Sequence, residues 1–352
     1  MRQKSEQKTS PIIMSLKYLD FWYWSRHFVD IYRPCPFNCS YCNTQTDIST
    51  RSMRFLPGLP NQPQTIGLGL LSDIYHHEPQ RNITVSNILE MLLRMEYPVT
   101  ILTKSDRIIE NLDVIKKLSH KDLIRITFTI LSLDEQLSSK LEGSAPAPSL
   151  RLNALKQLTA KGIPAGVAIT PIIPFITDKE KSLTDLVQEA KKNGAKWVLF
   201  SGFDPISSAK QDIISETITS IHSDTQKLDR RYSKIKRHMI GLLHEERLPM
   251  RIPRITLKKF SKSYYTNLTS EYLFNVSYLY ELLDRELEMR RYRRVAYDIE
   301  NLNHSLKTLT SKGKLGYLKG VNPEIEGIIR EVAYSGTSEF YSSLLEKVVA
   351  EV

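Results

Sequence analysis

Cysteine is scarce in this chain: among 352 residues only Cys35, Cys39 and Cys42 are present. An odd number of thiols within eight positions excludes a disulfide framework, and residues 1–16 contain no apolar signal segment, so we expect a reducing, cytoplasmic setting. No run of eighteen or more apolar residues predicts a membrane span. A hydrophobic content of 41% fills an ordinary core without covalent help. The cysteines therefore indicate chemistry rather than stabilisation.

Negative charge is in deficit, with a formal net charge of +10. Residues 227–262 hold twelve Lys and Arg against three acidic residues, a net charge of +9, and a second basic run, RRYRR, occupies 290–294. Such a distribution favours an anionic partner, and DNA or RNA is the partner that we expect for 227–262. A solvated helix face is the alternative for both runs.

Short apolar or β-branched runs alternate with amphipathic patterns over the first two thirds of the chain. The predicted strands are 29–33, 65–71, 98–102, 123–130, 165–170 and 196–202, and the predicted helices between them are 85–95, 108–119, 150–162 and 183–194. Gly162 and Gly194 suit left-handed caps at two of the helix ends. Repeated strand-helix units predict an α/β fold, an open sheet or a barrel, with its chemistry at the carboxyl ends of the strands.

The alternation stops at about residue 226. The rest of the chain, including 270–309, is rich in Tyr and Arg and indicates mainly helix. We therefore predict an N-terminal extension at 1–27, an α/β unit at 28–226 and a basic, mainly helical region at 227–352.

The spacing Cys35-x3-Cys39-x2-Cys42 allows one loop to surround a metal centre with three thiolates, which favour zinc or an iron-sulfur cluster. A closed structural site needs four ligands, whereas three protein ligands leave a position open for a reacting group. A zinc site completed by His76 or His77 is the alternative interpretation.

This motif follows the first predicted strand and has Tyr41 before its last cysteine, and in this context it resembles the radical S-adenosylmethionine (SAM) superfamily. The resemblance implies a partial (β/α)6 TIM-type barrel in which the three thiolates hold a [4Fe-4S] cluster. It also implies that SAM chelates the fourth iron and that an electron donor of the flavodoxin or ferredoxin type reduces the cluster. Reductive cleavage of SAM would then yield a 5'-deoxyadenosyl radical that abstracts hydrogen from a substrate.

Four blocks are similar to the spore photoproduct lyase-like branch, also described as DNA repair photolyase-like. They are SDIYHHE at 72–78, ILTKSDRIIENLDVI at 101–115, FTILSLDEQLSSKLEGSAPAPSLRLNAL at 128–155 and ITPIIPFITD at 169–178. The resemblance implies that Asp73 accepts hydrogen bonds from the SAM ammonium and that Lys104 binds the SAM carboxylate. Thr129 and Arg151 are further candidates for cofactor binding. Their structural alternatives are a turn residue, a surface lysine, a strand threonine and a helix-face ion pair, respectively.

The chain also departs from that branch. PCPFNC replaces the usual Gly-Cys opening and its histidine, and EGSAP carries Ser144 where arginine is common. Leu70 occupies the position of the fourth cysteine, the hydrogen-atom donor of true spore photoproduct lyase. Repair of the thymine spore lesion by the usual radical route is therefore not expected. Tyr41 and Tyr75 are the candidate hydrogen donors, with packing against the cofactor as their alternative.

Three hypotheses follow. The first is a radical SAM enzyme acting on nucleic acid, as a lyase or a modifying enzyme. The second is the same chemistry on a peptide or small molecule. The third is a noncatalytic nucleic-acid-binding protein stabilised by zinc or a cluster.

Overall fold

A computed structural model describes most of the chain, and its residues form two compact units, 1–252 and 253–352. The described residues are 12–31, 35–42, 59, 63–75, 79–202, 225–257, 261–302 and 305–351.

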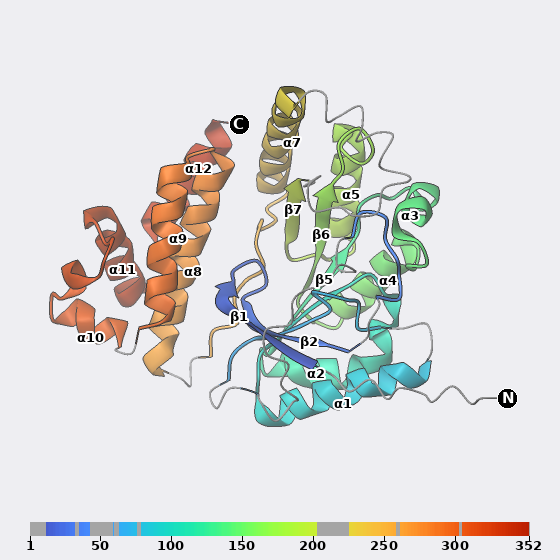
Figure 1. The fold of residues 1–352 in the computed structure, drawn as a ribbon, viewed down its shortest axis with the longest axis horizontal. Helices are drawn as coiled ribbons and strands as arrows, with labels where there is room; N and C mark the ends of the chain where they lie inside the picture. The colour runs from blue at the N-terminus through green and yellow to red at the C-terminus, as the bar shows by residue number, and fades with distance from the viewer. Residues whose placement is uncertain are drawn as a thin grey trace. The chain divides into compact units, whose positions relative to one another are not determined.

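The first unit is built on a seven-stranded sheet with the strands in chain order (Figure 1). Its strands are β1 (Ile12–Asp20), β2 (Ser25–Asp30), β3 (Ile66–Leu68), β4 (Val99–Thr103), β5 (Ile124–Thr129), β6 (Ala165–Ile172) and β7 (Val198–Gly202). From β2 to β7 every neighbouring pair is parallel, whereas β1 pairs antiparallel with β2. Six parallel strands in sequential order are the arrangement of a partial TIM-type barrel, so the predicted fold class is confirmed.

Helices lie between the parallel strands of the first unit and follow the last of them. They are α1 (Pro79–Met95), η2 (Asp106–Asn111), α2 (Leu112–His120), α3 (Glu135–Glu142), α4 (Pro148–Thr159), α5 (Glu180–Lys192) and α7 (Thr225–Glu245). Local signals set several ends: Asp134 accepts from two backbone N–H groups at the start of α3, and Pro148 occupies the first turn of α4. Gly162 and Gly194 have φ of 73° and 87°, so the predicted left-handed positions are confirmed.

The strands are buried because helices cover the sheet. All six residues of β5 are buried, and Ile66, Ile101 and Phe128 have no exposed surface. Strands that are buried on both faces are typical of parallel sheets covered by helices. The carboxyl ends of β2 to β6 consequently meet at one edge, and the segments that follow them lie together.

The structure corrects the predicted N-terminal extension, because β1 is a strand of the sheet. A short turn joins β1 to β2, and the Asp20 carboxylate accepts from the backbone N–H of Trp22 at 2.8 Å and of Tyr23 at 3.2 Å. The Arg251 guanidinium lies 4.7 Å from the ring of Phe21 and 5.2 Å from that of Trp24. These contacts fix the turn against the segment that follows α7.

The first unit also extends beyond the boundary predicted after residue 226. Helix α7 packs against α5 and β7, and the Trp24 indole donates to the Ile252 carbonyl at 2.7 Å. The division between the units therefore falls between Ile252 and Pro253.

The second unit is helical, as the composition predicts. Its helices are α8 (Ser261–Leu282), α9 (Glu286–Glu300), α10 (Leu306–Ser311), η3 (Leu315–Tyr317), α11 (Pro323–Ser335) and α12 (Glu339–Ala350). Helices α8 and α9 pack along each other around buried side chains such as Phe274, Val276 and Val295. Among the helices that the structure describes, none combines the length and apolarity needed to cross a bilayer.

Candidate functional site

A cavity of about 340 Å³ opens at the carboxyl edge of the parallel strands. Its walls come from the cysteine loop after β2, the segments after β3 and β4, the ends of β5 to β7 and the turn between β1 and β2. The lining residues are Tyr23, Cys35, Phe37, Asn38, Cys39, Tyr41, Cys42, Gly69, Leu70, Leu71, Ser72, Asp73, Leu102, Thr103, Lys104, Thr129, Thr170, Pro171 and Gly202. This is the edge at which (β/α) barrels carry their chemistry.

All three cysteines line this cavity and all are free thiols. Cys39 is buried, while Cys35 and Cys42 are partly exposed. The Cys35 sulfur accepts from the backbone N–H of Asp73 at 3.5 Å, and the N–H of Cys42 bonds to the Cys39 carbonyl at 3.2 Å. Among the residues that the structure describes, no three His, Cys, Asp or Glu side chains lie close enough together to bind one metal ion. His76 and His77, the predicted alternatives, lie outside the described residues.

The surroundings of Cys35 and Cys39 favour the neutral form of both thiols. Burial raises the pKa of Cys35, and burial raises the pKa of Cys39 to about 11 although the Lys104 ammonium opposes the shift. Glu142 and the other two thiols add to the shift of Cys39. A metal centre that binds here would therefore displace thiol protons, because thiolates are the ligand form.

Asp73 is buried after β3 and joins the ends of two strands. Its carboxylate accepts from the Thr103 hydroxyl at 2.9 Å, from the backbone N–H of Lys104 at 2.7 Å and from that of Tyr75 at 3.0 Å. Burial raises the pKa of Asp73 despite these donors. The side chain lines the cavity from a fixed position, one strand away from Cys35.

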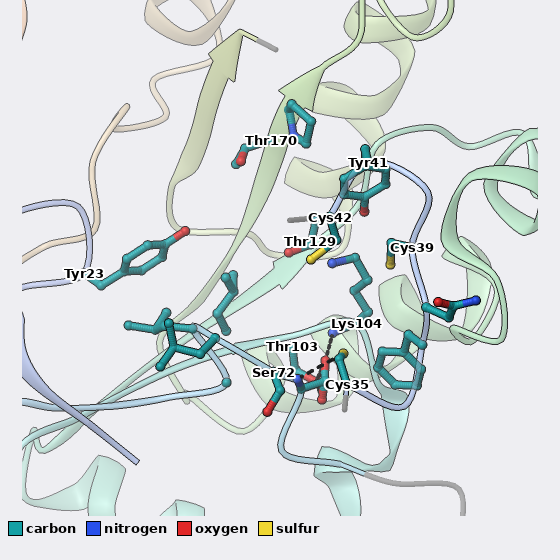
Figure 2. A pocket seen from close by; sticks show the side chains of 18 of the residues that line it. Tyr23, Cys35, Cys39, Tyr41, Cys42, Ser72, Thr103, Lys104, Thr129 and Thr170 are labelled. Atoms are coloured by element: carbon teal, nitrogen blue, oxygen red, sulfur yellow. Dashed lines mark hydrogen bonds between the residues drawn. The ribbon is translucent and has the colours of Figure 1, made fainter. Parts of the chain in front are cut away.

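Lys104 extends from the end of β4 into the space between the thiols, as Figure 2 shows. Its ammonium lies 5.5 Å from the centre of the Tyr41 ring. Burial favours the neutral amine, but Cys39, Glu142 and Cys42 outweigh it, so the pKa of Lys104 is raised. The cavity thus holds a stable cation among its sulfur atoms.

The remaining predicted residues divide between the cavity and its outer wall. Tyr41 and Thr129 line the cavity. Tyr75 has no exposed surface, and Arg151 is 1% exposed; neither belongs to the lining. The Tyr75 hydroxyl has no hydrogen-bond partner among the described residues. Arg151 donates to the carbonyls of Pro146 at 2.8 Å and Thr129 at 2.9 Å.

Two residues of this region were not predicted. Glu142, in the EGSAP block, pairs with the Arg151 guanidinium at 2.6 Å and accepts from the Tyr41 hydroxyl at 2.6 Å. Tyr23 reaches into the cavity from the turn between β1 and β2, opposite the cysteine loop (Figure 2). The family block pointed to the neighbourhood of Glu142, whereas no local pattern pointed to Tyr23.

Several cations of the basic segment are paired with carboxylates of the same chain or are buried. Arg231 pairs with Asp178, Lys234 pairs with Glu180 at 2.8 Å and Lys236 is buried. In the second unit, Arg254 pairs with Glu300 at 2.5 Å. Arg230 and Arg237 are not in ion pairs among the described residues, and Arg230 is exposed.

Comparison with known proteins finds relatives over part of the chain. No family model matches. The sequence is 24% identical to an uncharacterized protein of Mycobacterium tuberculosis over 198 residues, which cover 50% of this chain and 58% of the relative. It is 27% identical to an uncharacterized protein of Methanocaldococcus jannaschii over 169 residues, 44% of this chain and 64% of the relative. The chain therefore spans less than two thirds of the length of these relatives.

Among solved structures, the chain is similar to a spore photoproduct lyase mutant with bound AdoMet and dinucleoside spore photoproduct. The identity is 18% and the TM-score 0.39, covering 49% of this chain and 56% of that one. It is also similar to Streptococcus suis SuiB bound to precursor peptide SuiA, with 14% identity, a TM-score of 0.36 and coverage of 56% and 44%. Spore photoproduct lyase is also the branch that the four sequence blocks resemble. A likeness at these TM-scores does not assign a function to this chain.

Proposed function

We propose that this chain is a radical SAM enzyme. The observation that carries the proposal is the convergence of three free thiols, the Lys104 ammonium and the Asp73 carboxylate on one cavity. These groups come from segments after three different strands, β2, β3 and β4. Only the folded sheet brings them together, at the edge where barrel enzymes bind their ligands.

The residues present fit a cluster and a small cofactor. Cys35, Cys39 and Cys42 would each hold a different iron, which requires thiols distributed around a space rather than gathered on one ion. A volume of about 340 Å³ is at the lower end of small-molecule pockets, roughly 300–1,000 Å³. When bound, the cluster would supply the electron that cleaves SAM and so starts hydrogen abstraction from a substrate.

The protein's own groups would bind and orient SAM. The Lys104 ammonium is the cation available to the SAM carboxylate, and its raised pKa keeps it charged. Asp73, after β3, and Thr129, at the end of β5, offer oxygen atoms in the same cavity. Leu70 and Leu71 also line the cavity, and their apolar side chains would limit the access of water to a reactive intermediate.

Nucleic acid is the substrate class that we propose first. The net charge of +9 over residues 227–262 supports an anionic partner, and Arg230 and Arg237 are cations of that segment outside the described ion pairs. Leu70 replaces the hydrogen-donor cysteine, so the proposed reaction is not the usual repair of the thymine spore lesion. Tyr41, which lines the cavity, is the proposed hydrogen donor in its place.

A peptide or small-molecule substrate is the second candidate. It is favoured by the pairing of Arg231 with Asp178 and of Lys234 with Glu180, because each carboxylate offsets a positive charge of the basic segment. Both candidates share the same cavity and the same radical chemistry. They differ only in what binds outside it.

Anaerobic incubation with SAM and dithionite tests the proposal without knowledge of the substrate. The expected result is a brown, iron-containing protein that forms 5'-deoxyadenosine, and a Lys104→Ala variant that forms less. A colourless zinc protein that forms no 5'-deoxyadenosine would instead support the noncatalytic hypothesis.

A further inference from the structure

The end of α3 contacts the cysteine loop through residues 141–144, which we call the brace. The Ser40 N–H donates to the Leu141 carbonyl at 2.8 Å, and the Ser40 hydroxyl donates to the same oxygen at 3.0 Å. On the other side of the brace, the Ser144 N–H donates to the Phe37 carbonyl at 3.2 Å. Backbone bonds therefore fasten both halves of the loop to the brace.

The approach of the two segments requires glycine in the brace. Gly143 has φ of 57°, a left-handed conformation that side chains disfavour. A Cβ atom at this position would lie 2.4 Å from the Phe37 carbonyl oxygen, closer than such atoms approach. The brace thus lies against the loop backbone with no room for a side chain between them.

One side chain extends this contact to the second half of the loop. The Tyr41 hydroxyl donates to one oxygen of the Glu142 carboxylate at 2.6 Å. Tyr41 lies between Ser40 and Cys42, and its ring packs beneath the Lys104 ammonium. Glu142 therefore restrains the part of the loop that carries two of the three thiols.

Glu142 is in turn held by Arg151. Its second carboxylate oxygen lies 2.6 Å from the Arg151 guanidinium, and both side chains are 1% exposed. Arg151 bonds the Thr129 carbonyl at the end of β5, so the connection runs from the loop to the sheet. The oxygen that faces Arg151 makes the ion pair without a hydrogen bond among the described residues. Because a buried pair is costly without further bonds, the Tyr41 hydroxyl on the other oxygen and the two carbonyls that accept from Arg151 stabilise it.

We propose that Glu142 is a positioning residue that acts through Tyr41 to hold the cysteine loop in place before any cofactor binds. Arg151 orients the carboxylate through the buried ion pair. The loop restraint is a property of the metal-free protein. Its benefit to a cluster, by preorganising Cys39 and Cys42, rests on the proposed function.

The test measures how fast each cysteine of the metal-free protein reacts with N-ethylmaleimide, resolved by mass spectrometry. Cys39 is 5% exposed, so its labelling reports transient opening of the loop. Removal of a hydrogen bond to a charged group in Tyr41→Phe should raise the rate about tenfold or more. Glu142→Ala should raise it at least as much.

The labelling rate of the double variant distinguishes a positioning role of Glu142 from a general effect on stability. If Glu142 acts through Tyr41, the double variant labels Cys39 no faster than Glu142→Ala alone. The matched control is Glu300→Ala, which breaks the buried Arg254–Glu300 pair of the second unit and should leave Cys39 labelling unchanged. An unchanged rate in both brace variants, additive effects, or an equal rise in the control would each overturn the proposal.

A reconstituted sample keeps this inference separate from the proposed function. With iron and sulfide added, Tyr41→Phe should lose iron to a chelator faster than wild type, while Glu300→Ala should not. If the wild-type protein takes up no cluster, the proposed function fails but the labelling result still decides the loop restraint.

Discussion

The two units each contain a buried arginine-glutamate pair, and the two pairs differ in what surrounds them. Glu142–Arg151 is 1% exposed on both sides, and Arg254–Glu300 is 7% and 9% exposed. The first is bonded to Tyr41 of the cysteine loop. The second is bonded to Ser270 and joins α8 to the end of α9. Identical chemistry therefore fastens a candidate active site in one unit and a helix pair in the other.

The burial of an ion pair therefore does not by itself indicate a functional role. Both pairs bear a desolvation cost and both are stabilised by additional hydrogen bonds. Only the Glu142–Arg151 pair is connected to a wall of the cavity. The neighbours of a pair, and not its burial, indicate what it does.

Breaking each pair gives the largest expected effect. Arg151→Met and Arg254→Met should each lower stability by about 3–5 kcal/mol, because each leaves a carboxylate buried without its partner. Hydrogen exchange resolved by segment should place the loss in the first unit for Arg151→Met and in the second for Arg254→Met. The exposed Lys140→Met is the control. Loss of protection in the same unit for both variants would contradict the assignment of the two pairs to separate units.

Lys104 tests whether the cavity of the first unit binds the cofactor. Lys104→Ala should weaken SAM binding by roughly 1.5–3 kcal/mol, the range for hydrogen bonds to charged groups, and leave the iron content intact. Anaerobic calorimetry measures the affinity, with exposed Lys140→Ala as the control. Equal affinity in Lys104→Ala and wild type would exclude a role for this ammonium in binding.

Helix α7 contains basic residues outside the described ion pairs and basic residues within them, and we expect the two kinds to differ in their effect on DNA binding. If this helix contacts a phosphate backbone, changing Arg230 and Arg237 to Gln should reduce the log-log salt slope of duplex DNA binding by up to about 1.8, since each contact contributes about 0.9. Changing Arg231 and Lys234, which pair with Asp178 and Glu180, should reduce it less.

Fluorescence titration across a range of salt, on single and double strands, measures both slopes. No binding by wild-type protein at low salt, or a slope that neither variant changes, would move the preference to a peptide or small-molecule substrate.

The smallest expected effect is a pH dependence at the β1–β2 pairing. Burial lowers the pKa of His27, which bonds to Ser15 and Gln64. The folded protein then binds fewer protons than the unfolded chain, so this contribution is present above the ordinary pKa of about 6.5 and is lost as pH falls through the lowered value. Urea midpoints at several pH values should fall less steeply below neutrality in His27→Gln. Parallel curves for variant and wild type would contradict this assignment.

The sequence was sufficient to predict six parallel strands and four of the helical segments between them, whereas α3 was not predicted. Apolar strand runs and helical periodicity are local signals, and the cysteine spacing placed the loop after the first parallel strand. Strand β1 was not predicted, and its residues were assigned to an N-terminal extension. In the structure it pairs with β2 through a turn that begins at Asp20. Strand β2 begins at Ser25, earlier than predicted, because its pairing with β1 and β3 sets its limits.

The candidate site was predictable only where its residues follow the strands directly. Asp73 and Lys104 do so, and the structure brings both to the cavity. Tyr23 could not be predicted, because it reaches the cavity from the turn between β1 and β2, and the pairing of these strands was not predicted. The engagement of Arg151 by Glu142 also depends on the approach of α3 and α4, which no spacing rule encodes.

The Mössbauer spectrum of anaerobically reconstituted protein, compared between wild type and Cys39→Ala, tests the central claim most directly. The chain has three cysteines, so no other thiol is available to replace a lost ligand. The account predicts a full [4Fe-4S] signal in wild type and its loss in the variant, because two thiolates leave the cluster incompletely attached. A full signal retained in Cys39→Ala, or no cluster in wild type, would contradict it.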